Sequence, residues 1–545
     1  MTADVVISGG VVHDGTGGPG RRADIAIVDG NIAAIGEDVG AGCRVIDATD
    51  RVVSPGFIDI HTHSDQAVLL DPTCQSKVAQ GVTTDVTGNC GASPIPIEPT
   101  RLDRHYDQLK GRGLSPNERP VTWTDFDGYA SQVDGGRPAF NVAPLIGHHT
   151  LRTAAMGLDQ RAPTDDEMDT MRRLLALQLD QGAFGFSTGL TLVPGTYAAE
   201  DEIVALCEVV ASRDALYATH TRGSDNHLDF GGVVEALRTA KAAGARLQYS
   251  HAAINIPKHW GKADQVVALI EEARNGGLDV MFDVYPYDAS SSALTQYLPS
   301  WVQEGGTDAM RARLAEPSVY ERALAEFSAG WFGGIPWFWD RVMLSRVDPP
   351  DDWSVGMTIE EAAARAGEDP AAFALRLCLD HGNADRVVLF YRTEEDMKVF
   401  LAHPLSMVGS DGSAIPFDQG AEKPHPRSFG TYPRIFGRYV REQQVISLEE
   451  AVRKCTGAVA DRLGITDRGY LREGAVADVT IFDPATIIDR ATFTEPAQAP
   501  VGVDYVLVAG EVVIDGGDQT DARPGKVLRR PGHGGSSAAI ARSAA

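Results

Sequence analysis

The pattern of apolar and polar positions changes twice along the chain. Over residues 1–54, short apolar runs are separated by Gly-Gly, Asp-Gly and Gly-Asn pairs, and a similar pattern returns after residue 465. Short runs bounded by such pairs predict β-strands. The predicted strands include Val5–Ser8, Ala26–Val28, Val52–Val53, Val479–Phe482 and Tyr505–Val508. We therefore expect β-rich segments at residues 1–54 and 465–530, flanking a different central fold.

Between residues 55 and 464, apolar runs of four to seven residues alternate with helical periods. The predicted strands are Ala183–Ser187, Leu216–His220, Leu247–His251, Val280–Tyr285, Val387–Tyr391 and Met407–Ser410. The predicted helices are Asp165–Gln181, Asp201–Arg213, Val233–Ala243, Ala263–Gly276 and Glu394–His403. Repeated βα units indicate a parallel sheet, and this many favour an α/β fold of the (β/α)8 barrel type over a doubly wound sheet. No Gly-x-Gly-x-x-Gly turn follows the first strand, which weakens the dinucleotide-binding alternative.

Three segments depart from this alternation. Residues 295–385 lack it and hold five of the seven tryptophans, so we interpret them as an insertion over a strand end. A helix over Leu448–Leu463 ends the barrel, and residues 531–545 are rich in Gly, Ser and Ala. Such a composition predicts a disordered tail.

Composition and charge narrow the classes of function. Lys and Arg number 49 against 75 Asp and Glu, a net charge of −26, which argues against a nucleic-acid partner. Local cations can still bind an anionic small molecule. The chain has no apolar run of about 18 residues, and Met1–Gly20 lacks the pattern of a signal peptide, so we expect no membrane association. Six cysteines without a Cys-x-x-Cys pair predict reduced thiols in the cytoplasm.

Residues that can bind a metal follow several of the predicted strands. His61 and His63 come after Gly56-Phe57-Ile58, and residues two apart on an extended strand point to the same side. Because this short motif also occurs by chance, two ordinary histidines are the alternative. His220, His251 and Asp411 end three further strands, and such positions meet at the C-terminal face of a barrel. Four imidazoles and a carboxylate suit a zinc site.

Cys90 lies in Gly88-Asn89-Cys90-Gly91, after the apolar run Val82–Val86. The residue alone leaves two interpretations open. A lone cysteine is commonly a small buried side chain. At a strand end its thiolate can also bind or bridge metal.

In this order, the motifs resemble the amidohydrolase superfamily, and more closely its D-aminoacylase (N-acyl-D-amino-acid deacylase) branch. The resemblance covers nearly the whole chain. Its motifs are Pro55–His63, Gly81–Thr84, Gly88–Gly91, Gly185–Leu190, Tyr285–Ser291, Gly409–Gly412, His425–Thr431 and Gly474–Asp483.

The resemblance implies the fold, the reaction and the roles of the site residues. The fold is a (β/α)8 barrel with a flanking β-sandwich, and the reaction is zinc-dependent hydrolysis of N-acyl-D-amino acids. Cys90, His220 and His251 hold a tight zinc, and Cys90 is the bridging group. His61, His63 and Asp411 line a second, weaker position, and Asp411 is the general base. Tyr285, Ser291 and Arg427 contact the carboxylate of the substrate.

Two departures from the branch concern the substrate. Ala253 stands where the branch usually has a carboxylate-binding lysine, and Leu192 where it often has an aromatic residue. Lys258 and Lys262 are the nearby lysines that can compensate, although both also suit a solvated loop. We expect Arg427 to take over most of the carboxylate recognition.

Two other functions stay open on these grounds. One is a related amidohydrolase acting on a dipeptide, a cyclic amide or an N-acyl amine, and the other is a non-catalytic scaffold. The sequence leaves the acyl and side-chain preferences, the number of metals and the oligomeric state open.

Overall fold

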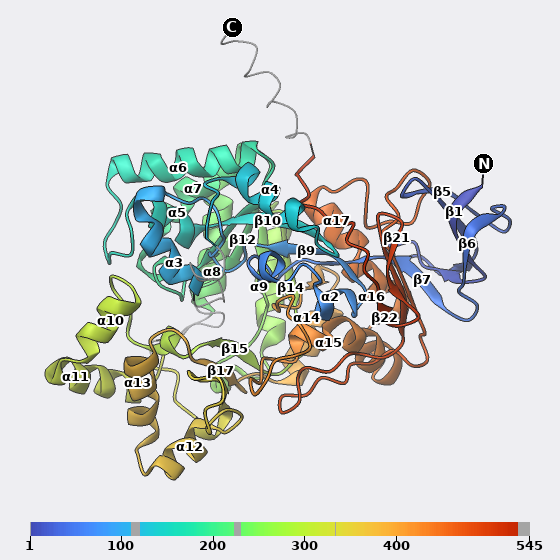
Figure 1. Ribbon diagram of the computed structural model, residues 1–545. Helices are drawn as coiled ribbons and strands as arrows, with labels where there is room; N and C mark the ends of the chain where they lie inside the picture. The colour runs from blue at the N-terminus through green and yellow to red at the C-terminus, as the bar shows by residue number, and fades with distance from the viewer. Residues whose placement is uncertain (1, 111–119, 223–229, 333, 532–545) are drawn as a thin grey trace, which may run out of the picture.

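The centre of the molecule is a sheet of eight strands that is nearly closed into a barrel (Figure 1). The computed structural model describes residues 2–110, 120–222, 230–332 and 334–531. The barrel strands are β8 (Phe57–Asp59), β9 (Val82–Thr87), β10 (Asn141–Gly147), β11 (Gly185–Gly189), β12 (Leu216–His220), β13 (Arg246–Tyr249), β14 (Val280–Val284) and β18 (Ser406–Val408). Neighbouring strands pair in parallel, and a parallel bridge between Thr62 and Gly412 joins the two ends of the sheet. The predicted parallel α/β barrel is confirmed.

Helices pack around this barrel, and their ends follow local sequence rules. They include α4 (Phe126–Gly136), α5 (His148–Ala155), α6 (Asp165–Asp180), α7 (Glu200–Ala211), α8 (Gly231–Ala243), α9 (Ala263–Asn275), α14 (Glu394–Ala402), α16 (Leu448–Cys455) and α17 (Gly457–Leu463). Helix α6 begins at a capping box in which Thr164 and Glu167 exchange hydrogen bonds. Its apolar residues Met171, Leu175 and Leu179 are fully buried, as its helical period predicts.

The prediction that Val387–Tyr391 is one of the alternating βα strands is wrong. Strand β17 (Arg386–Leu389) pairs antiparallel with β15 (Ser290–Ala293) and β16 (Val342–Arg346) in a separate three-stranded sheet. Val387 and Leu389 are fully buried there, in a hydrophobic core that the sheet shares with helices of the same region. A strand that is buried in any core appears in the sequence as an apolar run. This pattern alone therefore does not distinguish the barrel sheet from the three-stranded sheet.

The three-stranded sheet belongs to a lobe that lies between β14 and β18 in the chain (green to yellow in Figure 1). Its helices are α10 (Thr307–Leu314), α11 (Pro317–Ser328), α12 (Ile359–Ala366) and α13 (Pro370–His381). The core of the lobe contains Phe327 and Trp331, and Trp337 stacks on Trp339 at 4.3 Å between ring centroids. The lobe lies over one end of the barrel and, as shown below, supplies part of the cavity wall.

Two further sheets flank the barrel on the other side. One has the order β5-β4-β1-β6 and the other β22-β21-β20-β19-β7-β2-β3. The first contains β1 (Ala3–Ser8), β4 (Asp24–Val28), β5 (Asn31–Gly36) and β6 (Gly42–Asp47). The second contains β2 (Val11–Val12), β3 (Arg21–Arg22), β7 (Val52–Pro55), β19 (Val479–Phe482), β20 (Val503–Val508), β21 (Glu511–Asp515) and β22 (Asp518–Gln519).

The two ends of the chain meet in these sheets. Strand β7 pairs antiparallel with β19, with Val53 opposite Ile481. One hydrophobic cluster contains Ile25 from the smaller sheet together with Leu507 from the larger one. The expected disordered tail falls almost wholly on residues 532–545, which lie outside the described residues. Within the described ranges, the search for a helix long and apolar enough to cross a membrane found none.

Candidate metal centre

The six residues proposed as ligands from the sequence lie at the C-terminal ends of barrel strands. His61 and His63 follow β8, Cys90 follows β9, and Asp411 follows β18. His220 is the last residue of β12, and His251 lies two residues after β13. Their donor atoms form two groups, each with all its atoms within 4.8 Å of one another. The first group is His61, His63, Cys90 and Asp411, and the second is Cys90, His220 and His251. Cys90 belongs to both.

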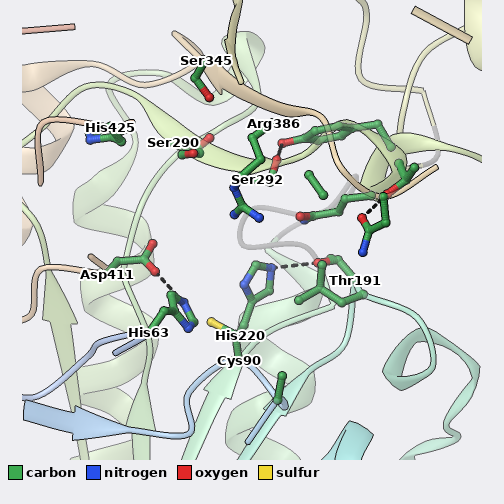
Figure 2. Close-up of a pocket in the computed structure, with 18 of the residues that line it drawn as sticks. His63, Cys90, Thr191, His220, Ser290, Ser292, Ser345, Arg386, Asp411 and His425 are labelled. Atoms are coloured by element: carbon green, nitrogen blue, oxygen red, sulfur yellow. Dashed lines mark hydrogen bonds and ion pairs between the residues drawn. The ribbon is translucent and has the colours of Figure 1, made fainter. Parts of the chain in front are cut away.

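The distances within these groups suit a shared metal ion. Cys90 Sγ lies 3.4 Å from His61 Nε2 and 3.4 Å from His251 Nε2. A sulfur and a nitrogen bound to the same tetrahedral zinc are separated by about 3.6 Å, given the usual ligand distances. His63 Nε2 lies 3.0 Å from Asp411 Oδ1, and His61 Nε2 lies 3.7 Å from the same oxygen. Figure 2 shows His63, Cys90, His220 and Asp411 converging at one end of a cavity.

The electrostatics leave two of the histidines neutral. Burial lowers the pKa of His220 to about 4 and lowers the pKa of His251 well below its ordinary value. A neutral imidazole has the free lone pair that a metal requires. His220 Nε2 lies 2.8 Å from Thr191 Oγ1, so this hydroxyl helps to orient the ring.

Asp411 remains a carboxylate in the same buried setting. Burial raises its pKa, but the nearby Arg427 guanidinium and the hydrogen bond from His63 outweigh burial and hold the pKa well below its usual range. Arg427 Nη1 lies 2.7 Å from Asp411 Oδ2. Both oxygens of Asp411 therefore face groups of the site, one the histidines and the other the arginine.

Backbone conformation turns three of these side chains into the site. Cys90, His251 and Asp411 have φ values of +53°, +39° and +53°, in the left-handed region that residues with a Cβ rarely adopt. Such strain persists where the surrounding structure fixes it, and it is common at functional sites. Gly88 has a φ of +76°, and a Cβ there would lie 2.1 Å from the carbonyl oxygen of Leu145. The Gly-Asn-Cys motif therefore lets the chain turn sharply against β10.

Two supporting groups were not predicted from the sequence. Asp283, in β14, lies 3.2 Å from His61 Nδ1 and accepts hydrogen bonds from the His251 backbone and from Gln248, both 2.8 Å long. It thus orients two of the proposed ligands, as outer partners of metal sites do. A carboxylate inside a buried apolar strand was the signal that could have identified it.

The second group is a buried network below the metal site. Lys77, from α2 (Gln75–Val78), donates to Asp59 Oδ2 at 2.6 Å and to Ser410 Oγ at 2.7 Å. Asp59 also accepts from the backbone N–H of Ser410, next to Asp411. Asp85 lies 3.7 Å from Lys77, and burial raises its pKa to about 7. The network ties the ends of β8, β9 and β18 together.

The cavity above the proposed ligands has a volume of about 460 Å³ and is walled by the barrel and by the lobe. All three residues expected to contact a substrate carboxylate line it: Tyr285, Ser291 and Arg427. Tyr285 Oη is buried and has no hydrogen-bond partner among the described residues. Leu192 also lines the cavity, whereas Ala253 is buried outside it.

The cations of the cavity wall are all arginines. Arg346, Arg386, Arg392 and Arg427 line it, and no lysine does so among the described residues. Lys258 and Lys262, the two lysines considered from the sequence, are thus not part of this wall. Arg392 and Arg386 were not identified from the sequence, because the lobe that presents them gave no motif.

Comparison with known proteins identifies the family. Residues 44–514 match the profile described as the amidohydrolase family. The chain belongs to the amidohydrolase family. The resemblance inferred from the sequence motifs is thereby confirmed.

Two curated relatives match almost end to end. The N-acyl-D-glutamate deacylase of Alcaligenes xylosoxydans xylosoxydans is 37% identical over 97% of this chain and 96% of its own length. The D-aminoacylase of the same organism is 34% identical over 97% of this chain and 98% of its own.

Solved structures agree with these matches. The N-acyl-D-glutamate deacylase of Bordetella bronchiseptica, complexed with zinc and a phosphonate inhibitor, has a TM-score of 0.82 at 36% identity. The alignment covers 97% of this chain and 100% of that one. A D-aminoacylase described as defining a novel subset of amidohydrolases has a TM-score of 0.79 at 32% identity, with the same coverage.

Proposed function

We propose that this amidohydrolase uses zinc to hydrolyse the amide bond of N-acyl-D-amino acids, producing a carboxylate and a D-amino acid. The observation that carries the proposal is the cluster of four histidines, one cysteine and one aspartate at the barrel end, in two groups that share Cys90. Relatives that are 34–37% identical over the same length are deacylases of N-acyl-D-glutamate and N-acyl-D-aspartate and a D-aminoacylase. These relatives support both the reaction and the class of substrate.

We propose that Cys90, His220 and His251 hold the tighter zinc. The two neutral imidazoles and the thiol of this group make a donor set that zinc prefers. His61, His63 and Asp411 would hold a second, weaker ion, and Cys90, which belongs to both groups, would be the bridging group. A solved D-aminoacylase, 33% identical to this chain, is described as having a binuclear centre with activation by one metal and attenuation by the second, which supports the same division.

A zinc ion held by these residues would lower the pKa of a water toward about 7 from about 15.7 and would polarise the amide carbonyl. Side chains of the protein transfer the proton and donate hydrogen bonds in the cavity. Asp411, kept as a carboxylate by Arg427, takes the proton of the attacking water and delivers it to the leaving nitrogen. Tyr285 Oη and Ser291 Oγ supply neutral hydrogen-bond donors in the cavity wall, and residues of the lobe line the same cavity.

A panel of matched substrates tests this function. Purified protein with measured zinc content is given N-acetyl-D-amino acids, their L-enantiomers, D-dipeptides, a cyclic amide and an N-acyl amine without a carboxylate. We expect hydrolysis of the D-enantiomers with kcat/KM at least tenfold above every other class. Preference for a cyclic amide or for an uncharged N-acyl amine would replace the proposal with the related amidohydrolase activity. No hydrolysis and no stoichiometric metal would indicate a scaffold.

We further propose that residues 1–54 and 465–530 fold as one β-sandwich beside the barrel. The pairing of β7 with β19 and the hydrophobic cluster shared by the two sheets support it. We also propose a cytoplasmic location for the enzyme. All six cysteines are free thiols, which a reducing compartment preserves.

A further inference from the structure

The arginines of the cavity wall differ in how their charges are neutralised. Arg427 forms an ion pair with Asp411 at 2.7 Å, and Arg346 lies 3.6 Å from a carboxylate oxygen of Glu422. Arg392 has no carboxylate within 4.0 Å among the described residues; its Nε donates to the neutral Asn255 Oδ1 at 2.8 Å. Its two Nη groups have no hydrogen-bond acceptor in the described part of the chain. Arg392 is therefore a half-buried cation that lines the cavity and has no counter-charge within ion-pair distance among the described residues.

Arg392 lies next to the reactive end of the cavity. Its guanidinium carbon is 4.7 Å from the centroid of the Tyr285 ring, and the guanidinium carbon of Arg427 is 4.9 Å from the same centroid. Arg427 in turn contacts Asp411, the proposed general base. Both arginines thus lie against the Tyr285 ring, and Arg392 is close enough to His220 and His251 to help lower the pKa of each. The carboxylate of an N-acyl amino acid lies one backbone residue away from the scissile bond, a reach of at most about 3.6 Å.

The backbone around Arg392 is fixed on both sides. Tyr391 accepts a hydrogen bond from the Phe338 backbone at 2.6 Å and donates one to the Pro336 carbonyl at 3.1 Å. The Tyr391 carbonyl accepts from Trp260 Nε1 at 3.1 Å. On the other side, Thr393 caps helix α14 by accepting from the Asp396 N–H. A cation held in this way loses little freedom when an anion binds, which favours affinity.

We propose that Arg392 is the residue by which this enzyme selects substrates with a free carboxylate beside the scissile amide. The inference rests on the proposed function and names the side chain that recognises the negative charge of the substrate. The planar guanidinium presents its two free N–H edges to a carboxylate, and the unpartnered hydroxyl of Tyr285 completes the site. Arg427, whose charge is already matched by Asp411, also keeps that base ionised. The expectation that Arg427 carries most of the recognition stays a prediction, which the same variants test.

The test compares one substrate pair across five enzymes. The pair is an N-acetyl-D-amino acid that the enzyme hydrolyses and the same molecule with a carboxamide in place of the carboxylate. The enzymes are the wild type, Arg392→Gln, Arg392→Lys, Arg427→Gln and the control Arg346→Gln. The control removes a charge from the same wall that already has a partner, Glu422. Zinc content and melting temperature are measured for each protein.

We expect Arg392→Gln to raise KM for the carboxylate roughly 10- to 100-fold, the range for a lost charged hydrogen bond, with kcat and zinc content nearly unchanged. For the carboxamide, KM should change less than about threefold, because no charge is left unpaired. Arg392→Lys should raise KM for the carboxylate less than Arg392→Gln does. Lysine restores the positive charge but lacks the paired N–H donors of the planar guanidinium. Arg427→Gln should lower kcat for both substrates, and Arg346→Gln should leave the ratio of the two KM values unchanged.

Equal losses of Arg392→Gln on the two substrates would overturn the inference, and so would a similar carboxylate-specific loss in Arg346→Gln. If Arg392→Gln fails to fold, Arg392→Lys decides: a KM that rises more for the carboxylate than for the carboxamide supports the inference, and any other result overturns it. A wild type that does not hydrolyse N-acyl-D-amino acids fails the proposed function instead, and this result appears before any variant is made.

Discussion

Cys90 is the residue on which the two halves of the proposed metal site depend. Its sulfur lies 3.4 Å from one histidine of each group. We predict that Cys90→Ser lowers zinc affinity and kcat/KM together, each by on the order of 10- to 100-fold, the loss seen even for outer partners of metal ligands. Zinc titration and steady-state kinetics measure both. Cys378→Ser, a buried cysteine in the core of the lobe, is the matched control. Full zinc and full turnover in Cys90→Ser would make Cys90 a packing residue.

Asp411 should separate metal binding from proton transfer. Only one of its oxygens faces the histidines, and the tight group of ligands does not include it. We predict that Asp411→Asn keeps most of the tight zinc and loses about 10²–10⁴-fold in kcat, the usual contribution of a positioned general base. Pre-steady-state kinetics on metal-loaded protein checks this. Glu422→Gln, which alters another carboxylate of the cavity wall, should lose little. Activity like that of the wild type in Asp411→Asn would assign the base to another group.

Individual residues differ in how far the sequence reveals them. All six proposed ligands follow an apolar run, so strand ends that converge in a barrel could be predicted to bring them together. Asp283, Lys77 and Arg392 could not be identified in this way. Their importance comes from neighbours on other elements: His61 for Asp283, Asp59 and Ser410 for Lys77, and the ring of Tyr285 for Arg392. The pairing of Arg427 with Asp411 was hidden for the same reason.

At the scale of the elements, helix α3 (Leu102–Lys110) should lose stability at acid pH. His105 is buried in it, and its Nε2 accepts the backbone N–H of Glu98 at 3.1 Å. Burial lowers the pKa of His105 to about 4, below its unfolded value of about 6.5. A histidine with a lowered pKa stabilises the folded state above pH 6.5, and this stabilisation is lost as the pH falls toward 4.

We predict that the free energy of opening at this segment falls by about 3 kcal/mol between pH 6.5 and pH 4. Hydrogen exchange of the Glu98 amide, corrected for intrinsic rates, measures it. In His105→Gln the pH dependence should disappear. Amides of α6, whose capping residue Glu167 has a pKa of about 2, should keep their protection over the same range. A pH dependence that survives in His105→Gln would place its origin elsewhere.

Lys77 of helix α2 joins three strand ends through buried charges. Removing the cation would leave Asp59 and Asp85 buried close to each other without compensation. We predict that Lys77→Met lowers the free energy of unfolding by about 3–5 kcal/mol, the cost of removing one partner of a buried ion pair. Chemical denaturation measures the loss. The double variant Lys77→Met, Asp59→Asn should be closer to the wild type than the single one. A neutral single variant would mean that the buried ion pairs of Lys77 contribute nothing to stability.

Element type was easier to predict than element membership. The periods of α6 to α9 and the runs of β11 to β14 follow from burial of one helix face and of whole strands. The strand at Val387 shows where this reasoning fails, because the lobe has a core of its own and buries an antiparallel strand as completely as the barrel buries a parallel one. Pairing partners decide the difference, and these lie on other strands, so no local pattern contains them.

At the scale of the whole molecule, the metal site lies where the barrel closes. Its proposed ligands come from the first strand, β8, and the last, β18, as well as from β9, β12 and β13. The Asp411 N–H donates to the His61 carbonyl at 2.8 Å across the same seam. An ion held by these side chains therefore joins distant parts of the chain. His61 and Asp411, for example, are 350 residues apart in the sequence. Metal that binds the folded state alone must stabilise it.

We predict that chelation lowers the melting temperature and that zinc restores it. At a free zinc concentration 100 times Kd, the added stability is about 2.7 kcal/mol. Hydrogen exchange should locate the effect: the ends of β8, β13 and β18 lose protection without metal, while the core of the lobe, which contributes none of the proposed ligands, keeps it. Cys90→Ser should show a smaller shift in melting temperature at the same zinc concentration. Equal melting temperatures with and without stoichiometric zinc would mean that the ion binds the unfolded chain as well as the folded one, and that the barrel seam closes without it.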